Sequence, residues 1–197
     1  KPWHKAGFTG QDISVAVFDV EWFGLDWLGT ELGEVQTHDC FAHPSCLSEI
    51  DSWHPRFGFE RGFHGPACAE IIRDIAPDID LHLVKVLGGT SLENAVEWAI
   101  REDIDIISMS LSFFNNSFYD GTGFISNLVD RLHKHDIVLV TSAGNYAQEH
   151  YQDRFSPQIG TNTHQFDDSR GLPIYYKKGA RRLNLIWDQF DSCGQSD

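Results

Sequence analysis

Short apolar segments of strand length alternate with longer segments of helical periodicity through the first 145 residues, and this alternation leaves few folds open to the chain. The strand-type segments are residues 13–18, 81–86, 104–109 and 137–142. They are mostly apolar along their length, which is typical of strands covered on both faces of a parallel sheet. Strand–helix–strand repetition therefore predicts an α/β fold with a mainly parallel sheet.

Three segments between or after these strands have the apolar spacing of amphipathic helices. The apolar positions are Ala67, Cys68, Ile71, Ile72 and Ile75 in the first, Leu92, Ala95, Val96, Ala99 and Ile100 in the second, and Ile125, Leu128, Val129 and Leu132 in the third. We expect each set to form the buried face of its helix. Thr90 and Glu93 also fit a capping box, which predicts that the second helix begins directly after Thr90.

Charge and composition exclude several classes of function. The 197 residues carry 15 basic and 29 acidic side chains, for a net charge of −14, so we expect no binding to nucleic acid or to an anionic membrane surface. No stretch approaches the ~18–20 uninterrupted apolar residues of a membrane-spanning helix. The first residues do not resemble a signal peptide, and the start at Lys1 predicts a processed chain or a piece of a longer one.

The four cysteines do not form a disulfide framework at this chain length. Cys40 and Cys46 are close in the sequence and could bridge if the protein is exported, whereas Cys68 is predicted to be a small core residue and Cys193 has no evident partner. No H-E-x-x-H or C-x-x-C pattern occurs. The sequence therefore predicts no cofactor and names no metal ligands, although a structural metal such as calcium stays open.

Residues 39–63 have neither strand nor helical periodicity and are predicted to form a long loop. The loop contains four aromatic residues, Trp53, Phe57, Phe59 and Phe63. Long loops in compact domains are often functional, but aromatic side chains in a loop also pin it onto the core. Both interpretations stay open.

The pattern changes again after about residue 148. Residues 156–170 are polar and lack helical periodicity, and residues 183–188 alternate as a single strand would. We therefore expect residues 1–148 to form the α/β part and residues 149–197 to begin a β-rich inserted region, too short to close a core of its own.

Three polar residues come at or near the ends of predicted strands or at a helix start, where open α/β sheets place their sites. Asp19 closes the first strand, His64 opens the first helix, and Asn145 follows the strand 137–142. Together they suit acyl transfer: a histidine base, an aspartate that orients it, and an amide that stabilises an oxyanion. Taken singly, each has a structural explanation, as a turn or cap, a helix start, or a tight turn.

Four segments, in order, resemble the motifs of the subtilisin-like serine peptidases, the subtilases. They are residues 10–19 around the acid, 64–72 around His-Gly, 94–111 for a helix and the substrate-binding strand, and 142–145 for the oxyanion Ser-Ala-Gly-Asn. Asp120–Gly123 and the extended run 143–148 are similar to the large bacterial-type subgroup, in which a β-rich insertion follows the asparagine. The resemblance covers residues 6–148.

The resemblance implies a three-layer subtilisin-type fold and a serine endopeptidase that works through an acyl-enzyme. Asp19 would orient His64, His64 would act as general base and then acid, and Asn145 would bind the oxyanion. A peptide would lie along Ser110, Leu111 and Ser112, over a pocket floored by Ala143 and Gly144. The family also implies a location outside the cytoplasm, extracellular or in the cell envelope.

The chain departs from the family pattern in several places. Pro66 and Ala67 replace the usual residues after His-Gly, and Glu21 adds a negative charge near the predicted site. The Gly-Thr-Ser run at residues 89–91 precedes the asparagine, so we assign it to helix capping rather than to the nucleophile. We therefore expect an N-terminal part of a peptidase that is inactive alone and whose partner is the missing C-terminal part of the catalytic domain, which carries the serine.

Other readings of the sequence remain. A catalytically inactive relative that binds peptides or partner proteins would keep the same scaffold, although it would not need all three of the acid, the histidine and the asparagine. The glutamate-containing sedolisin variant is disfavoured by His64 and Asn145. A nucleotide-binding α/β domain is disfavoured because no glycine-rich phosphate motif follows the first strand.

Overall fold

The computed structural model describes residues 1–28, 30–47, 49–51, 62–114, 116–118, 120–146, 149–166, 171–172 and 183–186. The described chain divides into two compact units, Lys1–Gly144 and Asn145–Asp197. The helices and strands all belong to the first unit. In chain order they are α1 (Pro2–Lys5), β1 (Ser14–Asp19), α2 (Leu25–Leu28), β2 (Gln36–Asp39), α3 (His64–Ile75), β3 (Asp80–Lys85), α4 (Gly89–Arg101), β4 (Ile106–Met109), α5 (Phe124–Lys134) and β5 (Val138–Thr141).

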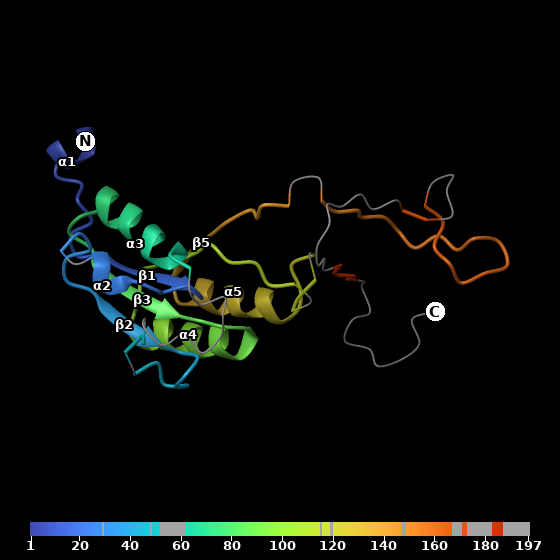
Figure 1. Cartoon of the computed structure of the whole chain (residues 1–197), viewed down its shortest axis with the longest axis horizontal. Helices are drawn as coiled ribbons and strands as arrows, with labels where there is room; N and C mark the ends of the chain where they lie inside the picture. The colour runs from blue at the N-terminus through green and yellow to red at the C-terminus, as the bar shows by residue number, and fades with distance from the viewer. Residues whose placement is uncertain are drawn as a thin grey trace. The chain divides into compact units, whose positions relative to one another are not determined.

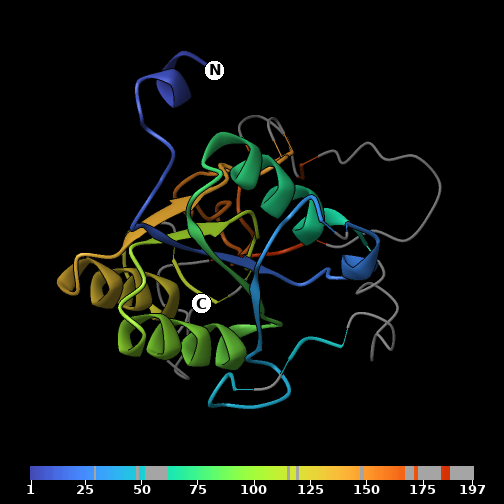
Figure 2. The same ribbon diagram turned by 90° about the vertical axis from the view of Figure 1, so that its left-hand side faces the viewer.

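The strands form one parallel sheet in the order β2-β3-β1-β4-β5, which confirms the predicted α/β class. α3 lies on one face of the sheet, and α4 and α5 lie on the other (Figures 1 and 2). The alternation of side chains along β1 explains these layers, because Val15 and Val17 pack with the α3 cluster while Ala16 and Phe18 pack with the α4 and α5 cluster. The strand is therefore buried on both faces, as its apolar run predicts.

β2 is an edge strand that the apolar pattern does not predict. Its sequence is Gln-Thr-His-Asp, and it pairs with β3 from Gln36 opposite His82 to Asp39 opposite Lys85. A polar strand of this length gives no apolar periodicity, so the sequence does not predict it. The loop predicted to start at residue 39 begins one residue later, because Asp39 is the last residue of β2. Within that loop, Trp53, Phe57 and Phe59 lie outside the described residues.

The start of α4 also differs from the prediction. The helix begins at Gly89 with Gly88 as its N-cap, and no side-chain cap is formed at that position, so the Thr90–Glu93 capping box is wrong. Gly88 has φ of 81°, a conformation that glycine adopts at little cost. The buried Ser91 instead accepts a hydrogen bond from the Leu87 N–H at 2.5 Å. The Gly-Thr-Ser run therefore forms the start of α4, as predicted, but the side chain that hydrogen-bonds there is Ser91 and not Thr90.

The buried face of α3 is smaller than predicted. Gly65, Pro66 and Ala69 are its buried residues, whereas Ile71 and Ile75 are 61% and 52% exposed. α3 approaches the sheet most closely through its small residues, while Ile72 packs partly buried on the same cluster and Ile71 and Ile75 lie outside the contact. The third helix, α5, follows its prediction more closely, with Leu128 and Leu132 buried.

A disulfide joins Cys40 and Cys46, the pair that the sequence left open. It closes the turn after β2 and packs in the same apolar cluster as α4. The Asn94 side-chain amide donates to the Cys40 carbonyl at 3.3 Å, which ties this turn to α4.

The second unit contains no strand at the described residues 183–186, so the strand predicted at 183–188 is wrong for that stretch; Trp187 and Asp188 lie outside the described residues. An isolated antiparallel bridge joins Pro157 and His164. None of the described helices has the length and apolar character needed to cross a bilayer.

Candidate active site

Asp19 is the last residue of β1, and its side chain is only 1% exposed. The chain turns directly after it, and oxygen Oδ1 accepts hydrogen bonds from the N–H groups of Val20 at 2.8 Å and Glu21 at 2.9 Å. These two bonds fix the carboxylate at the carboxyl end of the sheet. Oxygen Oδ2 remains directed at α3.

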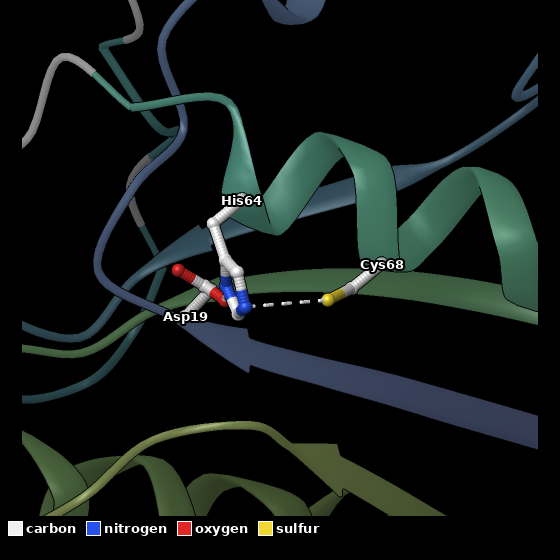
Figure 3. Close-up of side chains that lie close together, drawn as sticks. All are labelled: Asp19, His64 and Cys68. Carbon is white, nitrogen blue, oxygen red and sulfur yellow. Dashed lines mark hydrogen bonds and ion pairs between the residues drawn. The ribbon is translucent and has the colours of Figure 1, made fainter. Parts of the chain in front are cut away.

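His64 is the first residue of α3, and its ring lies over the Asp19 carboxylate (Figure 3). The ring nitrogen Nδ1 lies 2.6 Å from Oδ2 of Asp19. An ionised carboxylate can only accept, so Nδ1 carries the hydrogen and Nε2 of the neutral ring carries the lone pair. The side chain of His64 is 47% exposed, and Nε2 is thus available to take a proton.

Gly65 allows α3 to come this close to the end of β1. Its N–H donates to the Glu21 carbonyl at 3.0 Å. A Cβ atom at this position would lie 2.5 Å from the same carbonyl oxygen and 3.0 Å from Cβ of Asp19. The glycine of the His-Gly pair is therefore required for the geometry of the Asp19–His64 pair, a role that the sequence reasoning did not assign.

Cys68 lies one helical turn after His64, and its sulfur is 3.9 Å from Nε2 of the ring (Figure 3). The side chain packs against the apolar cluster under α3 but is only partly buried, so the prediction of a plain core residue was incomplete. Burial raises the pKa of the Cys68 thiol, the nearby Asp19 charge raises this pKa further, and a hydrogen bond with Ser110 opposes both effects. The i, i+4 spacing from His64 is the sequence signal that could have revealed this contact.

Asp19, His64 and Cys68 are the group of side chains in the described part of the chain that could hold a metal ion. One donor atom from each lies within 4.8 Å of the others. The sequence named no metal ligands because a His-x-x-x-Cys pair matches none of the usual zinc patterns.

The predicted substrate-binding residues follow the ends of two neighbouring strands. In the sheet register, Phe18 pairs with Met109 and Met109 pairs with Thr141, so the carboxyl ends of β1, β4 and β5 lie side by side. Ser110, Leu111 and Ser112 come directly after β4, and the Ser110 hydroxyl hydrogen-bonds with Cys68. Ala143 and Gly144 follow β5.

Asn145 is the first residue of the second unit. The structure brings Asp19, His64 and Ser110 to one edge of the sheet. Because Asn145 belongs to the other unit, its role as oxyanion donor stays a prediction.

Three aromatic rings form a small cluster: Phe63, which precedes His64 in the sequence, and Phe23 and Trp27, which follow β1. Phe63, Trp27 and Phe23 contact one another with ring centroids 5.4 to 5.6 Å apart. Phe63 comes from the end of the predicted loop, so at this position the loop's aromatic side chain packs on α2 and the residues before it. Trp27 and Phe63 nevertheless keep 61% and 51% of their surface exposed.

A family profile and individual protein sequences both match this chain, and they point to the same family. The sequence profile described as the subtilase family matches residues 61–180, which is more than half of the chain. Subtilisin E from Bacillus subtilis is 29% identical over 154 residues, which cover 72% of this chain and 36% of that protein.

Two further relatives extend the comparison. A thermostable alkaline protease from Halalkalibacterium halodurans is 36% identical over 165 residues, covering 78% of this chain and 42% of the relative. The minor extracellular protease Epr from Bacillus subtilis is 26% identical over 156 residues, covering 72% of this chain and 21% of the relative. The chain thus spans less than half the length of each of these relatives.

Proposed function

Because the chain belongs to the subtilase family, we propose that it supplies the general base and its orienting acid to a serine endopeptidase. The observation that carries the proposal is the 2.6 Å hydrogen bond between the buried Asp19 carboxylate and Nδ1 of the half-exposed His64. This bond holds the imidazole in the tautomer that a general base needs, and it stabilises the imidazolium formed during the reaction.

The proposed reaction is hydrolysis of a peptide bond through an acyl-enzyme. Nε2 of His64 takes the proton from a serine hydroxyl as its oxygen attacks the peptide carbonyl, and the imidazolium then gives that proton to the leaving amine. In the second half, His64 removes a proton from water as the water oxygen attacks the acyl carbon, and the imidazolium then gives that proton to the serine oxygen as its bond to the acyl carbon breaks. Asn145 donates its amide hydrogen to the oxyanion in this scheme.

The substrate peptide is proposed to run along Ser110, Leu111 and Ser112, with its side chain over Ala143 and Gly144. These residues follow neighbouring parallel strands, and Ser110 lies next to the Asp19 end of β1. Extended backbone after a strand end offers N–H and C=O groups to a peptide added alongside it.

The nucleophile is proposed to come from a further segment of the catalytic domain, the partner that completes the site. Among the hydrogen bonds of the described residues, Nε2 of His64 meets the Cys68 sulfur and no serine hydroxyl. β5 supports such an assembly because it is the last strand of the sheet order, and Val138 and Val140 are each 55% exposed. Without that segment we expect the 197-residue chain to hydrolyse no peptide at a measurable rate.

An extracellular location is part of the proposal. The Cys40–Cys46 disulfide favours an oxidising compartment. One relative is named as an extracellular protease.

The test is a peptidase assay on the protein that contains this chain together with the serine-bearing segment. We expect His64→Ala to lower kcat by about 10⁶-fold and Asp19→Asn by about 10⁴-fold, because the first removes the base and the second favours the wrong tautomer. His133→Ala, on the exposed side of α5, is the matched control and should keep full activity. Peptide binding without hydrolysis in the unaltered protein would instead favour the inactive peptide-binding relative.

A further inference from the structure

The geometry points to a zinc-binding site formed by Nε2 of His64 and Sγ of Cys68, with Asp19 supporting the histidine from behind. The two donor atoms come from one face of α3, because residues four apart lie one above the other on a helix. Both point toward the same space beside the end of β1 (Figure 3). The proposed occupant is Zn²⁺, which combines well with a thiolate and an imidazole.

The separation of the donor atoms suits a single bridging ion. With a metal–sulfur bond of about 2.3 Å and a metal–nitrogen bond of about 2.0 Å, the 3.9 Å between Sγ and Nε2 corresponds to an S–metal–N angle of about 130°. A tetrahedral ion needs about 3.5 Å between these atoms. A small rotation of either side chain closes that difference.

The Asp19–His64 pair provides the outer support that histidine ligands commonly have. A ligating histidine usually donates its other N–H to a carboxylate, which fixes the tautomer and makes the ligating nitrogen more basic. Here Nδ1 donates to the buried Asp19 oxygen at 2.6 Å, so the lone pair of the ring is on Nε2, the atom that faces Cys68. The arrangement needed for a metal–histidine–carboxylate triad is therefore already present.

Binding replaces the thiol proton with the metal ion. The Cys68 S–H bond breaks, its proton passes to the solvent, and the sulfur electron pair forms the metal–sulfur bond. Oxygen Oδ1 of Asp19 is engaged by two backbone N–H groups and Oδ2 by His64, so Asp19 acts through the ring rather than as a direct ligand. Water fills the remaining positions, and with two protein ligands instead of four the ion binds reversibly.

An ion at this site has a consequence that rests on the proposed function. It would occupy the Nε2 lone pair with which His64 takes a proton from the nucleophile. Zinc would therefore inhibit the assembled peptidase, and removal of zinc by a chelator would restore it. Binding itself requires no peptidase activity and is tested on this chain alone.

The experiment titrates the chain with Cd²⁺, a spectroscopic substitute for Zn²⁺ that absorbs in the ultraviolet when bound to a thiolate. Cys193, which lies outside the described residues, is first replaced by Ser so that Cys68 is the remaining free thiol beside the Cys40–Cys46 disulfide. We expect a saturable absorption band that excess Zn²⁺ removes. In the same background, Cys68→Ser should abolish the band.

Three further variants test whether the thiol acts together with the imidazole. His64→Ala should weaken Cd²⁺ binding at least about tenfold, and Asp19→Asn about 10- to 100-fold, because the amide can donate to Nδ1 and move the proton to Nε2. His64→Gln is a second test of the ligand, far-ultraviolet circular dichroism checks folding, and His133→Ala should change nothing. A missing band, a band that survives Cys68→Ser, or an affinity unchanged by both His64 variants overturns the inference. None of these results depends on whether the peptidase proposal holds.

Discussion

The contact between α3 and β1 depends on the absence of one side chain. Asp19 and His64 are 45 positions apart in the sequence, and they meet because Gly65 brings the helix against the Glu21 carbonyl. A larger residue would hold the helix away from the strand end. The residue types Asp and His are visible in the sequence, but their separation of 2.6 Å is decided by this backbone approach.

Replacing Gly65 with Ala tests that approach. The added Cβ would lie 2.5 Å from the backbone oxygen of Glu21, a clash that the backbone must relieve by shifting, so we expect a loss of about 1–3 kcal/mol in the free energy of unfolding. The same displacement should lengthen the Asp19–His64 hydrogen bond and shift the Nδ1 proton signal of His64 upfield in nuclear magnetic resonance spectra. Gly171→Ala is the control, because its Cβ meets no atom within 4 Å, and it should cost less than about 0.5 kcal/mol. Equal stability of the two variants would contradict this account.

Secondary structure elements were predictable where a run of apolar residues forms them, even in β5, which is not buried on both faces as the sequence predicts. β1, β3, β4 and β5 fall on the predicted segments because each carries consecutive apolar residues. β2 was missed because its polar sequence becomes a strand only through pairing with β3. The buried face of α3 was misjudged for a related reason: periodicity shows which residues share a face, but small residues determined which face contacts the sheet.

β2, β3 and α4 also surround the partly buried His38, whose pKa links pH to stability. Nδ1 of His38 donates to the Cys46 carbonyl at 3.1 Å, and its Nε2 lies 3.2 Å from Nδ1 of His82. The ring centroids of His38 and Trp98 are 4.3 Å apart, with the two planes tilted by 42°. Burial lowers the pKa of His38, and the His82 and Arg101 charges lower it further, whereas the hydrogen bond to Cys46 and the Glu102 charge raise it. Asp80 faces His82 from β3, with Oδ2 at 3.2 Å from the His82 Nε2.

The lowered pKa of His38 gives a direction for the effect of acid. The unfolded chain takes up a proton at His38 near its ordinary pKa of 6.5, while the folded chain does so only at lower pH. Folding stability should therefore fall as the pH drops below about 6.5, since the unfolded state then binds more protons. Urea unfolding at pH 7.5 and pH 5.5 measures this loss, which should be smaller in His38→Gln and unchanged in His133→Gln. An equal loss in His38→Gln and the unaltered chain would assign it to other groups.

At the scale of the whole molecule, the sheet is covered unevenly. α4 and α5 lie over one face, while α3 covers the other face near β1 and β3 (Figure 2). Leu139 of β5 packs toward α4 and α5, so the alternation of the strand places Val138 and Val140 on the opposite face. Those two valines are each 55% exposed. A parallel sheet normally has both faces buried, so this part of the sheet is where the proposed remainder of the catalytic domain would pack.

Val140→Lys distinguishes a solvated sheet face from an assembly surface. In the 197-residue chain the side chain is already half exposed, so the free energy of unfolding should change by less than about 0.5 kcal/mol. In the protein that also contains the serine-bearing segment, the same substitution should cost about 1.5–3 kcal/mol, because it removes a fully buried valine and places a charge at the contact. Urea unfolding of both forms measures the difference, with Lys134→Ala on the exposed end of α5 as a control that should affect neither form. The same small effect in both forms would show that β5 stays solvated on this face. The serine-bearing segment would then pack on another surface of the sheet.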